Sequence, residues 1–558
     1  MAASTIALPA PVELARATAA AIPRDLSKSP LLGILGVITG AGVVTLTGRM
    51  ISLGLADLKG NLGFGFDDGA WISSAFNIAL MFIGPFTVYV GVLLGPRRVL
   101  LLAATAFTLI CLYAPFIHSY SLLIAAIALA GLTSGTFYPL TLTFALRNIP
   151  LRFLPFTIAL YATFVDGAVN IAPSLYGFYR EHMASPSNWI FWNSALITPF
   201  MVLCIYFGIP KPASAAKKSV APSFAGFLYA SAGLAMLYAA IDQGERLDWW
   251  RSGVFNALFF AGAFLTLCAV IRRLRKPNPL VDMPYLRQWN TILLGIGLFL
   301  FRFCLVATII LIPQSLSIHG FEPNEIGPAV IWSAAPLLVI AFVAGLLLTN
   351  GMDARLLMAS GFACMAFASY LNATMTSEWA AQNYYRTELL MGVGQGFAFI
   401  GLVGTIVLQG VFSGGMAKPP WILTFSAFFH VLRIFGGNLG AVFMGHFVAQ
   451  REKLHSNLLG LHVTSGSWIT AADLRELTVG LYSKSAGRLA AAERGVGIIG
   501  ARLRLQAYVL SINDGFYLVA WACVVALMLI FLMRKAPLNY GDLTAIQEQM
   551  STPSEAKS

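Results

Sequence analysis

The chain has 558 residues, of which 58% are hydrophobic and 11% are charged, and it carries a formal charge of +12 at pH 7. This composition excludes an ordinary soluble globular protein and indicates a polytopic membrane protein. The Lys and Arg residues are scattered over short loops rather than gathered on one surface. The positive charge therefore does not indicate a nucleic-acid-binding protein.

Apolar runs of about twenty residues recur from Leu31 to Arg534, and each is long enough to cross the hydrocarbon core of a bilayer as a helix. The strands of a membrane barrel would be about half as long and would alternate in polarity. We therefore predict an all-α polytopic membrane protein with about fourteen transmembrane helices. The first span begins near Leu31, and the others are expected at 69–95, 98–117, 120–146, 153–178, 189–209, 223–242, 252–272, 290–313, 325–349, 354–376, 386–411, 420–446 and 515–534.

An internal repeat predicts how these spans are grouped. Gly131 and Gly135 in the fourth span return as Gly392 and Gly396 in the twelfth, eight spans later. A spacing of six plus two helices predicts two six-helix bundles separated by an inserted helix pair, with the substrate site between the bundles. The predicted divisions are an amino-terminal tail (1–30), a first bundle (31–209), a linker with the inserted pair (210–281), a second bundle (282–535) that includes an outer loop (447–514), and a carboxyl-terminal tail (536–558).

The basic residues favour one orientation across the membrane. If the amino terminus is cytoplasmic, the inside loops hold most of the Lys and Arg of the short loops, as the positive-inside rule requires. Both termini are then cytoplasmic. Residues 1–29 lack the compact apolar core of a cleavable signal peptide. The inside residues include Arg97, Arg98, Arg147, Arg152, Lys217, Lys218, Arg272, Arg273, Arg275, Arg355, Lys418, Arg534 and Lys535.

The fifth span contains an acid, an amide and a proline within an apolar run. At helical spacing Asp166 and Asn170 fall on one face with Ser174 and Gly177. An ionisable group deep in lipid is costly unless it faces a protein interior or a wet cavity, so this face is a candidate functional site. Pro173 removes a backbone donor, and the helix can bend there. The alternative is a bent packing helix with a hydrogen-bonded Asp.

Three arginines in the spans complete a candidate cavity between the bundles. Arg302 and Arg433 fall near mid-span, and Arg49 lies about two-thirds of the way across the first span. Together with Asp166 and Asn170 they predict a coupling and substrate cavity with a positive balance. Desolvation favours a protonated Asp166 whereas a nearby Arg favours the carboxylate, so Asp166 is either a proton carrier or a fixed counter-ion. Each Arg has a structural alternative, since it can bond a carbonyl or brace a helix crossing.

Several glycines are assigned to helix packing. Gly131, Gly135, Gly392 and Gly396 have the small-xxx-small spacing that lets helices approach closely. Gly436 and Gly437 beside Arg433 indicate another tight crossing.

Other chemistries lack a pattern in the sequence. The histidines show no His-Glu-x-x-His pattern, and no Gly-x-x-x-x-Gly-Lys-Ser/Thr phosphate loop is present. All six cysteines lie within the apolar runs, where we interpret them as packing residues. We therefore expect no catalytic residues, no metal site and no cofactor, and we predict that the protein is not an enzyme. An ion gradient remains as the source of energy.

The outer loop, 447–514, contains two amphipathic segments. Thr470 and Asp473 resemble a capping box that opens a helix with Leu474, Leu477 and Leu481 on one face. A second apolar stripe runs from Ile498 to Ile512, and Gly495, Gly497 and Gly500 are expected to separate the two helices. These faces predict a folded cap that either docks an accessory protein or lies on the outer mouth of the molecule.

At several points the chain resembles the fourteen-helix drug/proton antiporter branch of the major facilitator superfamily, the EmrB/QacA type. The resemblance runs from about Leu31 to Lys535 and rests on the combination of its motifs. They are the outer turn Asp57–Gly63, the helix-five motif Gly167 with Ala172-Pro173 and Gly177, the helix-six entry Trp189–Asn193, the helix-seven end Leu237–Trp249, the linker Pro279–Asp282 and the helix-thirteen signature Arg433–Gly440.

The chain also departs from the family pattern. Thr47 stands where the family usually has an acid, the loop Leu93–Arg97 lacks the expected Asp, and Ile127 occupies the place of the helix-four Arg. Those family positions are associated with gating and proton coupling. The resemblance therefore implies a transporter more firmly than it implies proton coupling, and the fold alone does not name a substrate.

From the resemblance we predict a secondary active transporter that exports small organic compounds, such as drugs or toxic metabolites, in exchange for protons by alternating access. The alternative is uptake or facilitated transport of an organic anion, and a receptor or an enzyme is disfavoured. The expected partners are a small-molecule substrate, protons, the lipid bilayer and a periplasmic membrane-fusion adaptor, but no nucleic acid. The expected location is the inner (plasma) membrane of a bacterial cell.

Overall fold

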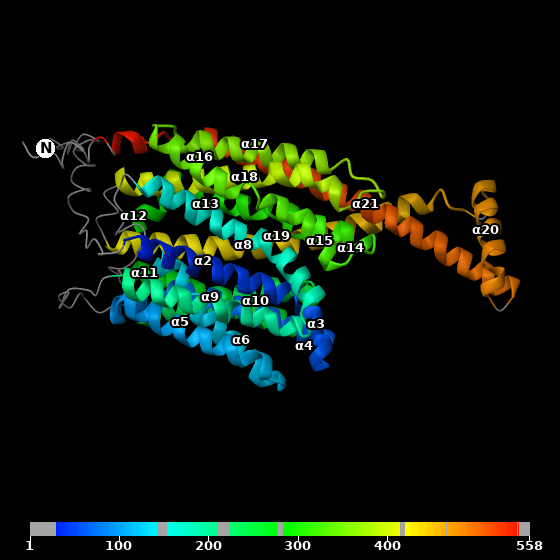
Figure 1. The fold of residues 1–558 in the computed structure, drawn as a ribbon, viewed down its shortest axis with the longest axis horizontal. Helices are drawn as coiled ribbons and strands as arrows, with labels where there is room; N and C mark the ends of the chain where they lie inside the picture. Colours follow the sequence, from blue (N-terminus) through cyan, green and yellow to red (C-terminus); the bar gives the residue numbers. More distant parts are fainter. Residues whose placement is uncertain are drawn as a thin grey trace, which may run out of the picture.

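The computed structural model describes residues 30–141, 153–209, 224–275, 283–412, 419–464, 466–485, 487–543 and 545. Within these ranges fourteen helices are long and apolar enough to cross a membrane, which confirms the predicted all-α polytopic class. Most of these helices run side by side along the length of the molecule (Figure 1). The predicted amino-terminal tail before residue 30, the linker segments 210–223 and 276–282, and most of the carboxyl-terminal tail lie outside the described residues.

Glycine and proline mark some of the helix boundaries among the first six spans. Gly63 closes a short helix with a φ of 68°, and Gly95 separates two spans with a φ of 84° before Pro96 opens the next helix. Pro173 lies inside the fifth span, as predicted. The helices are α2 (Pro30–Leu53), α3 (Leu55–Leu62), α4 (Phe66–Leu94), α5 (Pro96–Tyr113), α6 (Tyr120–Ser134, helical again to Thr141), α8 (Leu154–His182) and α9 (Pro186–Gly208).

The inserted pair comprises α10 (Phe224–Gly244) and α11 (Gly253–Arg275). α10 packs against α4, where Ser74 donates a hydrogen bond to Asp242 and Gln243 donates to Ser74. α11 buries little of its surface and exposes Phe260 and Phe264. Such an apolar, exposed helix fits contact with lipid.

Two spans of the second bundle are interrupted. The ninth is built from α13 (Trp289–Cys304), a π-helical turn η4 (Ala307–Leu311) and α14 (Ile312–Ile318), and the tenth from α15 (Pro323–Val330), η5 (Ile331–Ser333) and α16 (Leu337–Thr349). Pro313 and Pro336 lie next to the breaks, because proline has no N–H for the helix ladder. The remaining helices are α12 (Met283–Leu286), α17 (Ala354–Asn372), α18 (Ala381–Phe412), α19 (Pro419–Gly460) and α21 (Arg488–Phe531).

Helix α8 lies between the two bundles. It packs against α15 and α16 of the second bundle. A Cβ atom built on Gly177 would lie 2.7 Å from the Asn324 Cα atom, and one on Gly345 would lie 2.5 Å from the Phe156 ring. The bundles also meet where His430 of α19 contacts the Leu80 carbonyl of α4 at 3.1 Å. The fifth span is therefore placed to respond to any movement between the bundles.

Helices α19 and α21 continue well beyond the other spans and form an extension that carries α20 (Trp468–Leu481) at its tip (Figure 1). The extension projects away from the body and does not lie across its mouth. Asp514 fixes its base, since it accepts hydrogen bonds from Arg451 and from His455 at 2.7 Å. Of the two alternatives for the outer loop, docking an accessory protein or lying on the outer mouth, the arrangement in Figure 1 does not match the second.

The predicted boundaries inside this extension also need correction. Gly495, Gly497 and Gly500 do not separate two helices, because all three lie inside α21. The break falls at Gly487, which has a φ of 125°. Each glycine costs a helix only about 1 kcal/mol, and Gly495 allows close packing against Leu474. α20 begins after Ser467 rather than at the predicted Thr470 capping box.

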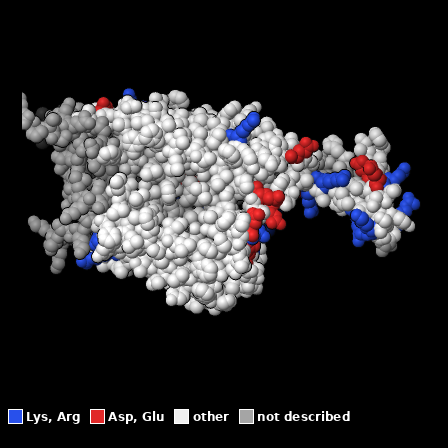
Figure 2. All heavy atoms as spheres, in the orientation of Figure 1, with Lys and Arg blue, Asp and Glu red and all other residues white. Residues whose placement is uncertain are grey.

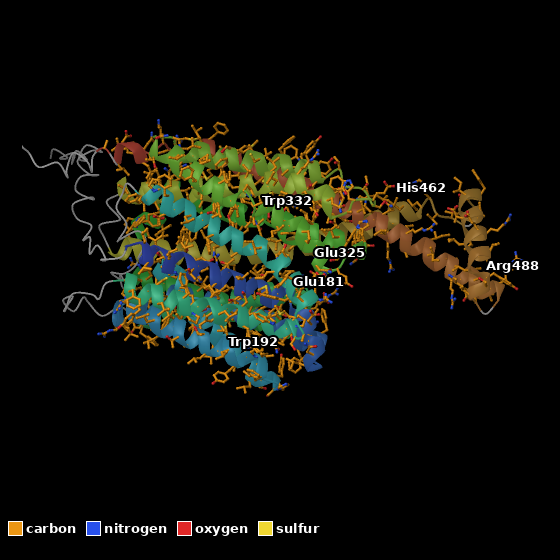
Figure 3. All side chains as sticks on the ribbon, in the orientation of Figure 1. Glu181, Trp192, Glu325, Trp332, His462 and Arg488 are labelled. Atoms are coloured by element: carbon orange, nitrogen blue, oxygen red, sulfur yellow. The ribbon has the colours of Figure 1, made fainter. Side chains whose placement is uncertain are left out.

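Charged side chains are distributed as a membrane requires. Figure 2 shows a body almost free of charge in this view, whereas acidic and basic side chains gather at the base and tip of the extension. Figure 3 places Glu181 and Glu325 at the body end nearest the extension, and His462 and Arg488 on the extension itself. We call this the extension end. The opposite end, where Arg98, Arg273 and Arg534 lie near the predicted linkers, is the linker end.

Candidate functional site

Asp166 is the central feature of the candidate site. α8 holds its side chain in the interior with 1% of its surface exposed. Neither carboxyl oxygen has a hydrogen-bond partner among the described residues, and no cation there lies within ion-pair distance. The alternative of a packing helix with a hydrogen-bonded Asp is therefore not what the structure shows. Burial disfavours a charge in such a place, and the role of Asp166 as a proton carrier or as a fixed counter-ion stays a prediction.

Arg302 and Arg433 lie near enough for their charges to act on the Asp166 carboxyl group. Nε and Nη1 of Arg302 have no partner among the described residues. Its side chain emerges where α13 crosses α19, and a Cβ on Gly437 would lie 3.2 Å from Nη2. The structure thus brings together three of the residues predicted to form the cavity, with one guanidinium group available to a ligand.

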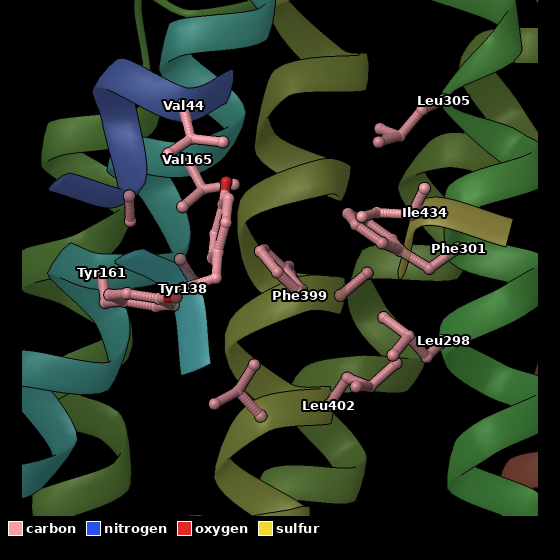
Figure 4. Close-up of a cluster of buried hydrophobic side chains, with 14 of the residues drawn as sticks. Val44, Tyr138, Tyr161, Val165, Leu298, Phe301, Leu305, Phe399, Leu402 and Ile434 are labelled. Carbon is pink, nitrogen blue, oxygen red and sulfur yellow. The ribbon is translucent and has the colours of Figure 1, made fainter. Parts of the chain in front are cut away.

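Arg433 is held by aromatic and hydroxyl groups of the first bundle. Its guanidinium carbon lies 3.6 Å from the centre of the Tyr138 ring, and Nη1 donates hydrogen bonds to the hydroxyl groups of Tyr138 and Thr45. Tyr138 and Tyr161 lie buried with Phe301 and Phe399 in the core that both bundles share (Figure 4). This cation–π contact fixes the charge of Arg433 at the boundary between the bundles.

Arg49, also predicted to line the cavity, contacts the second bundle through a backbone carbonyl. Its Nη2 atom donates to the carbonyl oxygen of Ile309, in η4 of the second bundle, at 2.8 Å. A hydrogen bond to a backbone carbonyl was the structural alternative for this arginine, and the structure contains that bond. Arg49 therefore joins the two bundles.

Asn170 belongs to a buried chain of polar side chains. Its amide nitrogen donates to Gln395 Oε1 at 2.8 Å, and Gln395 Nε2 donates to Thr308 Oγ1 at 3.1 Å. Thr308 Oγ1 in turn lies 3.3 Å from Glu388 Oε1, to which it donates. The chain runs from α8 of the first bundle through α18 and η4 of the second.

Glu388, Gln395 and Thr308 were missed in the sequence. Glu388 is 0% exposed, but the twelfth span was predicted to begin at 386, which placed the acid at the membrane surface. The helix begins at Ala381 instead. The signal was present, because Glu388, Gly392, Gln395 and Gly396 share one helical face.

The glycines predicted to serve packing lie at close helix crossings. A Cβ on Gly131 would meet the Phe76 carbonyl of α4, and one on Gly392 would meet the Ser333 carbonyl of η5. Gly135 and Gly396 face Ile83 and Ile340. A Cβ built on Gly436 would similarly lie 3.3 Å from the Phe299 Cα atom.

The helix-five motif lies along the contact between the bundles. Ala172 and Pro173 are buried in α8, and Gly177 approaches the Asn324 backbone. Gly167 is different, since a Cβ there would meet only Leu337 at an ordinary 3.6 Å. Close approach therefore requires glycine at 177 rather than at 167.

Within the described ranges no group of three or more His, Cys, Asp or Glu side chains is arranged to hold a metal ion. His430 uses Nε2 toward the Leu80 carbonyl and packs against Tyr138. Its surroundings are those of a helix contact.

A sequence profile of the major facilitator superfamily matches residues 37–411. The chain is 24% identical to the fatty acid resistance protein FarB of Neisseria gonorrhoeae over 491 residues, which cover 87% of this chain and 92% of that protein. It is 22% identical to the multidrug export protein EmrB of Escherichia coli K12 over 511 residues, covering 89% and 93%. These matches confirm the resemblance predicted from the motifs.

Among solved structures, the proton:xylose symporter XylE is similar in fold, with a TM-score of 0.52 at 10% sequence identity. The alignment covers 92% of this chain and 98% of the symporter. The similarity concerns the arrangement of the helices only.

Proposed function

Because the chain belongs to the major facilitator superfamily, we propose that it is a secondary active transporter that exports small organic compounds in exchange for protons by alternating access. The observation that carries this proposal is the buried, unpartnered carboxyl group of Asp166 on a helix that lies between the bundles. Its surroundings combine burial with the nearby positive charges of Arg302 and Arg433. A modest change in surroundings between the two access states can therefore shift the proton.

The same interior favours neutral or anionic amphipathic substrates. Two arginines act on one Asp, and Arg302 has nitrogen atoms free to bind an acidic group. Buried aromatic side chains line the neighbouring core and can accept an apolar tail (Figure 4). FarB, whose name refers to fatty acid resistance, is consistent with such a substrate.

We place the protein in the inner membrane of a bacterial cell, with both termini and the linker end in the cytoplasm. Arg98, Arg273 and Arg534 at the linker end support this orientation. The extension is then periplasmic. Its tip exposes Trp468, Val479 and Leu489, with 79%, 72% and 77% of their surface accessible. Exposed apolar side chains far from the membrane support docking of a periplasmic adaptor, as the family resemblance implies.

Reconstitution of the purified protein in liposomes tests the proposal. A pH-sensitive dye trapped inside reports proton movement when amphipathic acids, neutral compounds or quaternary ammonium dyes are added. The proposal expects proton movement that depends on the protein and on an acid or neutral compound. Transport of an acid that leaves the pH unchanged and follows only its own gradient would instead support facilitated anion transport.

A further inference from the structure

A second buried acid, Glu388, lies in the second bundle. α18 holds it at 0% exposure, and Oε1 accepts the hydrogen bond from Thr308. The Ser333 hydroxyl is beside the carboxyl group but donates to the Val330 carbonyl at 2.7 Å, which leaves Oε2 without a hydrogen-bond donor among the described residues. Burying an ionised carboxylate with so little compensation is strongly unfavourable. The carboxyl group therefore holds a proton in this conformation.

Helix packing does not explain an acid at this position. The glycine pairs 131/135 and 392/396 occupy matching crossings in the two bundles. Counting one turn back from each pair reaches Ile127 in the first bundle and Glu388 in the second, and both are 0% exposed. An apolar residue fills the first of these places. Packing at the second place would thus be served by an apolar residue as well. An acid there carries the energetic cost of burying a polar group.

The hydrogen bonds of Glu388 reach the helix between the bundles. Asn170, Gln395 and Thr308 each donate toward the acid, so the chain has one direction from α8 to Oε1. Asn170 lies one helical turn after Asp166. The link from Asn170 to Gln395 crosses from one bundle to the other and must break when they separate. Thr308 also lies in η4, the π-helical turn that Arg49 binds, and such turns are frequent at functional sites.

The charged and titratable groups around Glu388 are few. Tyr384 lies one turn before it on α18, and the helices packed against α18 include α8, which carries Asp166, and α13, which carries Arg302. Arg386 is exposed and points away from the core. None of the cations among the described residues forms an ion pair with Glu388. Loss of the hydrogen bond from Thr308, or entry of water, is therefore what changes its proton affinity.

We infer that Glu388 is a second proton-carrying residue, whose protonation is coupled to the contact between the bundles through Thr308, Gln395 and Asn170. The inference rests on the proposed function. The proton binds at Oε2 and neutralises the carboxylate while the bundles are in contact. When Asn170 withdraws, the chain opens and water reaches the acid. Water then donates hydrogen bonds to the carboxylate in place of Thr308, and the acid gives up its proton to that water.

The test compares wild type with Glu388→Gln, a neutral mimic of the protonated acid, in liposomes. Glu378→Gln, at an exposed glutamate just before α18, is the matched control. We expect Glu388→Gln to lose accumulation driven by a pH gradient, yet to keep exchange of labelled for unlabelled substrate, which needs no net proton movement. Thr308→Val keeps the acid but removes the hydrogen bond, and is expected to shift the pH dependence of transport.

Infrared spectroscopy provides a readout that is independent of transport. A protonated carboxyl group gives a carbonyl stretching band apart from that of carboxylates, and this band should shrink in Glu388→Gln but not in Glu378→Gln. The inference is overturned if Glu388→Gln accumulates substrate normally or keeps the whole carbonyl band. It is also overturned if Glu388→Gln fails to fold, because a glutamine should fit the space of a protonated glutamate. A wild-type protein that carries substrate down a substrate gradient without moving protons would instead overturn the proposed function.

Discussion

Arg49 of the first bundle donates a hydrogen bond to the carbonyl oxygen of Ile309 in the second, at 2.8 Å. The sequence explains why that oxygen is available. Pro313 follows Ile309 by four residues and has no N–H with which to bond it. A carbonyl oxygen that the helix break leaves unbonded in the second bundle thus accepts a hydrogen bond from a side chain of the first. This pairing ties together the extension-end halves of α2 and the ninth span.

Arg49→Ala should weaken this link between the bundles. Hydrogen bonds from charged groups contribute about 1.5–3 kcal/mol, and the substitution leaves the Ile309 carbonyl without its donor. We expect a lower Tm in detergent and greater labelling of cysteines introduced along α8. Arg386→Ala, which changes an exposed arginine, is the matched control. Unchanged stability and labelling in Arg49→Ala would contradict a linking role.

Asp166→Asn should abolish transport driven by a pH gradient while leaving the protein folded. The amide has nearly the size of the acid but cannot exchange a proton, and the native oxygens have no partners to lose among the described residues. Uptake into inverted membrane vesicles measures the effect, with the exposed Asp68→Asn as control. If Asp166→Asn still couples transport to the pH gradient, Asp166 is a fixed counter-ion rather than a proton carrier.

Arg302→Gln should discriminate between substrates by charge. Loss of a charged hydrogen bond of about 1.5–3 kcal/mol corresponds to roughly 10- to 100-fold in affinity. We expect an amphipathic acid to bind that much more weakly, whereas the affinity for a neutral compound of similar size changes little. Binding titrations on purified protein measure both. Wild-type export of quaternary ammonium dyes without export of any acid would show that the positive interior does not select the substrate.

Much of the fold follows from patterns that lipid imposes on a sequence. Long apolar runs are needed to cross a bilayer, so the fourteen spans and their order could be predicted. The ends of the helices could not be predicted where a helix continues beyond the membrane into water. Hydropathy ends the thirteenth span before the polar residues Arg451, Glu452 and Lys453, but α19 continues as one helix to Gly460. The polar residues of α21 before Asp514 likewise looked like a loop.

The candidate site was only partly predictable. Asp166 stands out because a lone acid in an apolar run has few explanations. The partner of Arg49 is a carbonyl oxygen that Pro313 leaves free in the other bundle. A single sequence does not reveal which carbonyl lies within reach of Arg49. Glu388 was overlooked because the start of its helix was placed five residues too late, which moved the acid from about two turns inside the helix to its first turn. Pairwise contacts between bundles are tertiary information, and residue type alone does not contain them.

The last prediction concerns the tip of the extension, where Trp468 and Val479 expose apolar side chains to water. Neither contributes to a buried core, so Trp468→Ser with Val479→Ser should leave folding unchanged. If the tip docks a periplasmic adaptor, the double variant should lose adaptor pull-down and export to the medium. Proton-coupled transport in liposomes should persist, because the extension stands apart from the body (Figure 1).

A control variant separates docking from a general effect of the extension. Asp514→Asn weakens the bonds to Arg451 and His455 at its base but leaves the apolar tip intact. It should reduce stability of the extension while retaining some adaptor binding, since the binding surface is unchanged. Full export to the medium by the tip variant would show that the exposed apolar residues are not the docking surface. Loss of transport in liposomes by that variant would instead assign the tip a role in transport itself.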